Sequence, residues 1–226
     1  MNNKPVTLVV GVSGGIDSAV TSALCAMTDL KTIAVSIPVR QNIDQHNLSL
    51  RHLKWLKNNF NNVENKIINL DDVFNVFAHS MKDFNNERAF ANSRSRFRMT
   101  TLYQIAQSNH GLVVGTGNKV EDFGVGFFTK YGDGGVDISP IADCTKTEVW
   151  EMGVTLSIIV DIIKAKPTDG LWSDNRDDEK QLGLTYQQIE EAMKNTSSIY
   201  YEKFKKIREQ NLHKMKKIPV CKFKES

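Results

Sequence analysis

The stretch "GVSGGIDSAV", residues 11–20, joins an apolar run to a helical pattern through a glycine-rich turn. Such a turn between a strand and a helix commonly holds phosphate, because backbone N–H groups and the positive end of the helix face the anion. In a P-loop a lysine precedes the final Ser or Thr, whereas Asp17 stands at that place here. A carboxylate repels phosphates unless a divalent cation lies between them. The stretch therefore predicts a Mg²⁺–pyrophosphate site; the alternative is an ordinary strand–helix turn in which Asp17 caps the helix.

Short β-rich runs alternate with helical patterns along the chain. We expect strands at 6–12, 32–39, 66–70 and 112–116, and helices at 18–27, 44–60, 71–84, 88–108, 145–158, 186–193 and 198–212. This alternation predicts an α/β fold, with a doubly wound, mainly parallel sheet and helices on both faces. Ligands of such sheets bind outside the carboxyl ends of the strands. Both "GVSGGIDS" (11–18) and "GTGNKVED" (115–122) fall there.

Two later segments do not follow this alternation of strands and helices. Residues 115–135 hold seven of the fourteen glycines, so we expect loop and tight turns there. Residues 164–183 are polar and rich in helix breakers, which predicts a long mobile loop. The sequence as a whole predicts one domain, residues 1–226, with this loop and a basic C-terminal flap at 212–226.

Composition narrows the class of protein. Hydrophobic residues make up 40% and charged residues 24%, as in ordinary globular enzymes. No apolar stretch approaches the roughly 20 residues that span a bilayer, and the first residues show no signal-peptide pattern. Cys25, Cys144 and Cys221 are far apart and lack CxxC spacing. We therefore expect neither a disulfide framework nor a zinc site, and a cytoplasmic protein.

Positive charge gathers near the C-terminus. Residues 203–224 contain nine Lys or Arg and a single acid, Glu209. Such a run is often a solvated basic helix and tail, but it can also form an anion-binding flap. A nucleic-acid surface is a third interpretation, which the lack of regularly interleaved aromatic residues makes the weakest.

The string "SGGIDS" (13–18) resembles the pyrophosphatase loop of the N-type ATP pyrophosphatases. Those enzymes split ATP between the α and β phosphates and adenylate an oxygen of the substrate. Four further blocks resemble one branch of that group, the NAD synthetase family: "NSRSRFRM" (92–99), the segment 115–149 with "GFFTKYGDGG", "KPTDGLWSDNRDDEKQLGLTYQQIE" (166–190) and "LHKMKKIP" (212–219). The resemblance covers residues 6 to 219 and implies a Rossmann-like fold of the adenine nucleotide alpha-hydrolase type.

The resemblance also implies roles for single residues. ATP phosphates would be held by Gly11, Val12, Ser13, Gly14, Gly15, Ile16, Asp17 and Ser18, with Lys146 and Thr168, while Thr116 would contact the adenylate part of ATP. Deamido-NAD would be bound by Arg96, Lys130, Asp137, His213 and Lys214. The metal carboxylates would be Asp17 and Glu121, or Asp122 in place of Glu121, because the spacing to "GFFTKYGD" is one residue longer than in many relatives. Asp17 and Lys146 would serve catalysis, and Asp133 would take a proton from ammonium.

The implied reaction is the ATP-dependent amidation of deamido-NAD to NAD. The nicotinate carboxylate would attack ATP, releasing pyrophosphate, and ammonia would then displace AMP from the mixed anhydride. The chain has no room for a glutaminase domain, which predicts free ammonia or ammonia from a separate glutaminase. The expected partners are ATP, deamido-NAD, ammonia, Mg²⁺ and a second copy of the chain in a homodimer, without a membrane or nucleic acid. Two alternatives stay open: a tRNA-modifying member of the same group, and a non-catalytic nucleotide-binding module.

Overall fold

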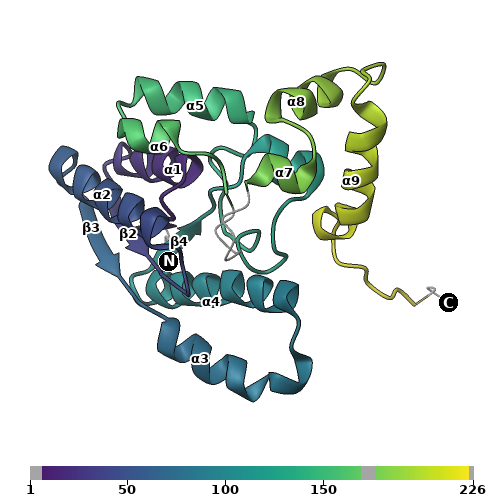
Figure 1. Cartoon of the computed structure of the whole chain (residues 1–226). Coiled ribbons are helices and arrows are strands. Elements are labelled where there is room, and N and C mark those ends of the chain that lie inside the picture. Colours follow the sequence, from purple (N-terminus) through teal and green to yellow (C-terminus); the bar gives the residue numbers. More distant parts are fainter. Residues whose placement is uncertain (1–6, 169–176, 224–226) are drawn as a thin grey trace.

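A four-stranded parallel sheet lies at the centre of the computed structural model, which describes residues 7–168 and 177–223. Its strands are β1 (Thr7–Gly11), β2 (Lys31–Ser36), β3 (Val63–Ile67) and β4 (Gly111–Val114), in the order β3-β2-β1-β4 (Figure 1). All three strand pairs are parallel, which confirms the predicted sheet. β3 begins three residues before the predicted run at 66–70. The chain continues alongside β2 after β3, because the amide of Ile68 donates to Ser36 O and that of Leu70 to Pro38 O.

Helices cover both faces of the sheet, as predicted. One face carries α1 (Ile16–Ala26) and α2 (Ile43–Asn59), and the other carries α3 (Asp71–Ser80) and α4 (Glu87–Ser108) (Figure 1). Alternate residues of each strand point to opposite faces. The side facing α1 and α2 buries Leu8, Val10, Ala34, Leu53 and Leu56, and the side facing α3 and α4 buries Val9, Ile33, Val35, Phe74 and Leu102.

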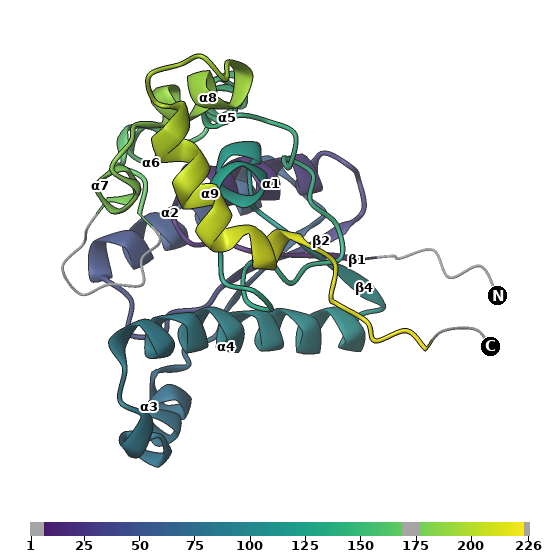
Figure 2. The same cartoon turned by 90° about the vertical axis from the view of Figure 1, so that its right-hand side faces the viewer.

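Two further helical groups flank this core. α5 (Lys146–Thr155) and α6 (Val160–Lys164) pack on α1, and they share a core with Ile16, Ala19, Val20 and Ala23. α7 (Asp178–Leu182), α8 (Tyr186–Lys194) and α9 (Tyr201–Met215) form a separate cluster with the π-helix η2 (Lys119–Val125). Figure 2 shows α9 passing across η2.

Several predicted boundaries were wrong. The helix expected at 145–158 ends at Thr155, before α6, and the helix expected at 71–84 ends at Ser80, before a short 3₁₀ turn, Lys82–Phe84. The loop expected at 115–135 contains η2, and the loop expected at 164–183 contains α7, although residues 169–176 of that loop lie outside the described residues. Asp177 caps α7 through Lys180 N, and Gly183 ends it at φ +69°. α9 continues four residues into the predicted flap, so the flap begins as helix.

No helix within the described ranges is long and apolar enough to cross a membrane.

Candidate active site

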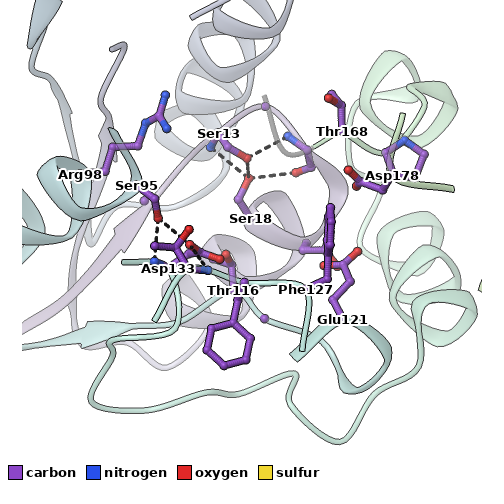
Figure 3. A pocket seen from close by; sticks show the side chains of 18 of the residues that line it. Ser13, Ser18, Ser95, Arg98, Thr116, Glu121, Phe127, Asp133, Thr168 and Asp178 are labelled. Atoms are coloured by element: carbon purple, nitrogen blue, oxygen red, sulfur yellow. Dashed lines mark hydrogen bonds between the residues drawn. The ribbon is translucent and has the colours of Figure 1, made fainter. Parts of the chain in front are cut away.

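The turn between β1 and α1 is shaped for an anion. Gly14 adopts φ +97°, and a Cβ there would come within 2.4 Å of Gln45 O, so glycine is required. Ser18 Oγ accepts from Ser13 N at 3.2 Å and donates to Gly15 O at 2.9 Å (Figure 3). α1 begins at Ile16 without a side-chain cap, which leaves its first amides available to a ligand. The alternative in which Asp17 caps this helix is wrong, because the N-cap is Gly15 and Asp17 lies inside the first turn.

Three distant segments meet at one ammonium group. Lys146 Nζ lies 2.6 Å from Asp17 Oδ2 and 2.9 Å from Glu121 Oε1, and its side chain is only 2% exposed. Asn118 Nδ2 donates to the other oxygen of Asp17 at 2.9 Å. Lys146 opens α5, whose N-terminus is fixed by a capping box between Thr145 and Glu148. The three charged side chains therefore come from the first turn of α1, from η2 and from the first residue of α5, which are far apart in the sequence.

The electrostatics of this cluster follow from burial and pairing. Burial raises the pKa of Asp17, against the effect of Lys146. Burial alone would also raise the pKa of Glu121, but Lys146, Tyr186 and Asn118 together lower it. Burial alone would lower the pKa of Lys146, whereas the two carboxylates raise it. Lys146 is thus a fixed buried cation, and Glu121 is the carboxylate that its neighbours hold ionised.

The segment that carries Glu121 and Asp122 forms the π-helix η2. Single π-turns are rare and occur frequently at functional sites. Asn118 Oδ1 accepts from the amides of Val120 and Glu121, both at 3.0 Å, and fixes the start of η2. This arrangement turns Glu121 toward Lys146, while Asp122 packs against Gly117. Burial, and then the neighbouring acids led by Asp133, raise the pKa of Asp122 well above its usual range.

A cavity of about 860 Å³ opens at the carboxyl ends of the strands. Its lining includes most of the predicted site residues: Gly11, Val12, Ser13, Gly14, Gly15, Ile16, Asp17, Ser18, Thr116, Glu121, Asp133, Lys146, Thr168 and Lys214. Figure 3 shows Ser13 and Ser18 on one wall, with Glu121 to one side and the Ser95–Asp133 pair to the other. Asp122 also lines the cavity.

Asp133 is held firmly in this wall. Its Oδ1 accepts from Ser95 Oγ at 2.5 Å and from Thr129 N at 3.1 Å, and its own amide donates to Ser95 Oγ. Burial raises the pKa of Asp133 despite these donors. Lys214 lines the same cavity and donates to the carbonyls of Gly126 and Phe128 at 2.7 and 2.8 Å.

The other predicted substrate residues lie outside the described cavity wall. Arg96 Nε donates to Lys130 O at 3.2 Å, and Lys130 Nζ donates to His213 O at 3.3 Å. Asp137 accepts from Tyr103 Oη at 3.0 Å and from Val113 N at 2.8 Å, which ties it to β4. These four side chains are not brought together with the phosphate loop.

Sequence reasoning missed Arg88 and Arg98, which do line the cavity. Both lie on the face of α4 that also presents Asn92, Ser95 and Leu102 to the cavity. This three-to-four-residue spacing is the signal that separates Arg98 from its neighbours Arg94 and Arg96. Arg98 Nε also donates to Ile37 O at 3.0 Å.

The donor set suits Mg²⁺. Within the described ranges, no group of three or more His, Cys, Asp or Glu side chains is arranged to hold a metal. Asp17 and Glu121 nevertheless converge on one cationic atom, so a cation between them gains two carboxylate oxygens. Mg²⁺ commonly uses one or two carboxylates and takes its remaining ligands from phosphate and water. These two residues therefore fit the ion.

The fold and cavity define an α/β nucleotide-binding protein in which a carboxylate stands inside the phosphate loop. Comparison with known proteins gives the family: residues 2–225 match the model for NAD synthase. The NH(3)-dependent NAD(+) synthetase of Carboxydothermus hydrogenoformans is 38% identical over 188 residues, which cover 81% of this chain and 74% of that protein. The chain belongs to the NAD synthase family.

Two solved structures share the fold. An NMN synthetase from Francisella tularensis matches with a TM-score of 0.89 and 33% identity, over 99% of this chain and 92% of that one. An NH3-dependent NAD synthetase from Campylobacter jejuni matches with a TM-score of 0.77 and 24% identity, over 98% and 92%.

Proposed function

We propose that the protein is a ligase that uses ATP and ammonia to convert the nicotinate carboxylate of deamido-NAD into the amide of NAD. The observation that carries this proposal is the meeting of Asp17, Glu121 and Lys146 beside the phosphate loop, in a member of the NAD synthase family. A site built to grip the terminal phosphate for transfer would use a lysine at the position of Asp17. A carboxylate there suits Mg-pyrophosphate as a leaving group.

The reaction runs in two balanced steps. A carboxylate oxygen of the nicotinate forms a bond to the α-phosphorus of ATP, and the bond from that phosphorus to pyrophosphate breaks. Ammonia then forms the C–N bond at the activated carbonyl, AMP leaves, and one proton is released. Each step transfers charge to a phosphate oxygen that leaves, so fixed positive charge beside those oxygens lowers the barrier.

The chain's own residues divide this work. Residues 11–18 would bind the β and γ phosphates through backbone amides, and Lys146 and Thr168 would contact phosphate oxygens. Asp17 and Glu121 would hold Mg²⁺, which when bound supplies positive charge to the leaving pyrophosphate. Thr116 lies on the cavity wall, where it would contact the adenylate part of ATP. Asp133, with its raised pKa, would accept the proton from ammonium.

A nicotinate mononucleotide is a second candidate for the acid substrate. The Francisella tularensis protein with the TM-score of 0.89 is an NMN synthetase. In addition, Arg96, Lys130, Asp137 and His213, which the resemblance assigned to the dinucleotide, lie outside the described cavity wall. A mononucleotide acid needs fewer contacts beyond that cavity. The same chemistry would then give NMN in place of NAD.

One assay tests the proposal and separates the candidates. The full chain is given ATP, Mg²⁺ and ammonium with equal concentrations of deamido-NAD and nicotinate mononucleotide, and NAD, NMN, AMP and pyrophosphate are quantified. We expect AMP and pyrophosphate in equal amounts with NAD, and predominant NMN would select the second candidate. ATP binding without pyrophosphate release would instead indicate a non-catalytic module. ATP–pyrophosphate exchange that depends on RNA would indicate the tRNA-modifying alternative.

Three finer properties belong to the same proposal. We propose Mg²⁺ as the metal, a homodimer as the working form and the cytoplasm as the location. The three cysteines are free, which suits a reducing compartment. Light scattering of the purified chain measures the oligomeric state directly.

A further inference from the structure

Tyr186, the first residue of α8, is fully buried beside the charged cluster. Its hydroxyl donates to Glu121 Oε1 at 2.6 Å and lies 3.3 Å from Asp178 Oδ2. A phenol carries a single proton, so the shorter contact to Glu121 takes it. Figure 3 places Glu121 and Asp178 on the same side of the cavity. The hydroxyl therefore fixes one oxygen of the carboxylate that would hold the metal.

The ring of the same side chain contacts the other half of the cluster. Lys146 Nζ lies 4.9 Å from the centroid of the Tyr186 ring and 5.8 Å from that of Trp150. The two rings meet edge to face, with centroids 5.8 Å apart. A cation over an aromatic face is attracted to it, more strongly when water is excluded. One side chain thus orients both Glu121 and Lys146.

The backbone around Tyr186 is itself anchored. Its amide donates to Glu179 Oε1 at 2.9 Å, and Tyr186 itself lies within the capping box formed by Thr185 and Gln188. One turn further along α8, Glu190 accepts from Thr147 N at 3.0 Å and from Thr147 Oγ1 at 2.9 Å. Thr147 follows Lys146 in α5, so α8 holds the start of that helix as well. The position of Tyr186 is fixed relative to both charged partners.

We propose that Tyr186 is a positioning residue, which sets the Glu121 carboxylate and the Lys146 ammonium for Mg²⁺-pyrophosphate; this rests on the function proposed above. A tyrosine that only fills the core gives stability but has no specific effect on the metal. The Tyr186 hydroxyl donates to Glu121, a candidate metal ligand. Substitution of a group that hydrogen-bonds to a metal ligand commonly changes the metal affinity by about tenfold to a hundredfold. The metal affinity is therefore the property that distinguishes the two roles.

The test compares Tyr186→Phe with the wild-type full chain and with Tyr201→Phe as a matched control. Tyr201 lies at the start of α9 and packs against the same helical cluster. Mn²⁺ binding is followed by electron paramagnetic resonance in the presence of α,β-methylene-ATP, which cannot be split between these phosphates. We expect Tyr186→Phe to weaken Mn²⁺ binding about tenfold or more, while Tyr201→Phe and binding of the metal-free nucleotide stay unchanged. Equal Mn²⁺ affinity in Tyr186→Phe and wild type would overturn the proposal.

A double-mutant cycle identifies the partner. If the hydroxyl acts through Glu121, Tyr186→Phe should have little additional effect on Mn²⁺ affinity in a Glu121→Gln background. Fully additive effects would contradict that route. Failure of the wild type to bind Mn²⁺ with the nucleotide would count against the proposed function instead, so the two failures are distinguishable.

A wild-type measurement covers the case in which Tyr186→Phe does not fold. Addition of Mg²⁺ with inorganic pyrophosphate should change the tyrosine absorption of the wild type, and Tyr201→Phe should show the same change. An unchanged spectrum at saturating ligand would overturn the positioning role.

Discussion

The phosphate end of the cavity and its outer end are built differently. At the phosphate end, which comprises residues 11–18, Glu121 and Lys146, charged side chains contact one another directly. Lys146 is buried there, and Asp17 and Glu121 are partly exposed. At the outer end, Lys214 on the cavity wall donates to backbone carbonyls, and so do Arg96 and Lys130 beyond that wall. The first end is a preorganised charge cluster, whereas the second is a set of cations that bind the protein's own loops. We therefore expect substitutions at the phosphate end to lower turnover, and those at the outer end to change substrate affinity.

Asp17→Asn should have the largest effect. The substitution keeps the shape and the contact to Asn118 but removes the charge that would hold Mg²⁺. Turnover should fall about 100-fold or more, since a metal contact to the leaving group is lost. Steady-state kinetics at saturating Mg²⁺ measure it. Asp29→Asn, at an exposed position with φ +61° that asparagine tolerates, is the matched control. A near-normal rate in Asp17→Asn would contradict the metal-binding role of Asp17 and the difference expected between the two ends of the cavity.

A buried histidine on α2 should make the free energy of unfolding depend on pH. His52 on α2 is fully buried, and its Nε2 lies 2.9 Å from Ser22 Oγ on α1. Burial lowers the pKa of His52 to about 4, from 6.5. Between these two values the unfolded chain binds a proton that the folded chain does not, so stability present above pH 6.5 is lost as the pH falls toward 4.

We expect this proton to lower the free energy of unfolding by about 2 kcal/mol from pH 7 to pH 5. Urea unfolding at both pH values measures it, with His52→Gln to remove the dependence and the exposed His79→Gln as control. Parallel pH profiles for wild type and His52→Gln would show that His52 does not cause the pH dependence of the free energy of unfolding.

Substitutions of Glu121 and Asp122 test which of these two acids would bind the metal at the phosphate end. Glu121→Gln should raise the Mg²⁺ concentration needed for half-maximal activity by about tenfold or more, because Glu121 is the carboxylate paired with Lys146. Asp122→Asn should leave that requirement nearly unchanged, since burial keeps its pKa high. A titration of activity with Mg²⁺ measures both variants. The reverse order would assign the metal-binding role to Asp122.

The contrast between the two ends also explains what the sequence could predict. Asp17 and Gly14 belong to a tight turn whose geometry is encoded within a few residues, and both lie where the motif predicts. Glu121, which the sequence left open against Asp122 as the second metal carboxylate, lies in η2 and contacts Lys146. Local motifs such as these are the part of a site that a single sequence specifies well.

The missed features depend on packing between distant segments. Tyr186 gave no signal in the sequence, because its role arises only where α8 meets η2 and α5. Arg98 and Arg96 stand in one short basic stretch, and helical spacing distinguishes them only once the face of α4 that lines the cavity is known. α7 was missed because its polar residues hide a five-residue helix, which is defined by the Asp177 cap and by Gly183. Each miss reflects tertiary contacts that override or complete a weak local pattern.

We expect the smallest effects at the outer end, where substitutions of the neighbouring residues His213 and Lys214 should differ in their effect on KM. Lys214 is half-buried, lines the cavity and donates to the carbonyls of Gly126 and Phe128. His213 is exposed, and its backbone oxygen, not its imidazole, accepts from Lys130. Burial, and then the neighbouring cation Arg88, lower the pKa of Lys214.

Lys214→Met should therefore raise KM for the nicotinate substrate by about fivefold, corresponding to about 1 kcal/mol for one charge-assisted contact. KM for ATP and kcat should change little, because a contact that is equal in the ground and transition states leaves kcat unaffected. His213→Ala should change KM less than about twofold, as for a solvated imidazole. Steady-state kinetics of both variants measure this, beside an RNA titration across salt concentrations, because a nucleic-acid tail would instead lose a salt-dependent affinity. Equal effects of the two substitutions on the nicotinate substrate would show that the whole tail closes over it, and the outer end would then be a flap that moves as one unit.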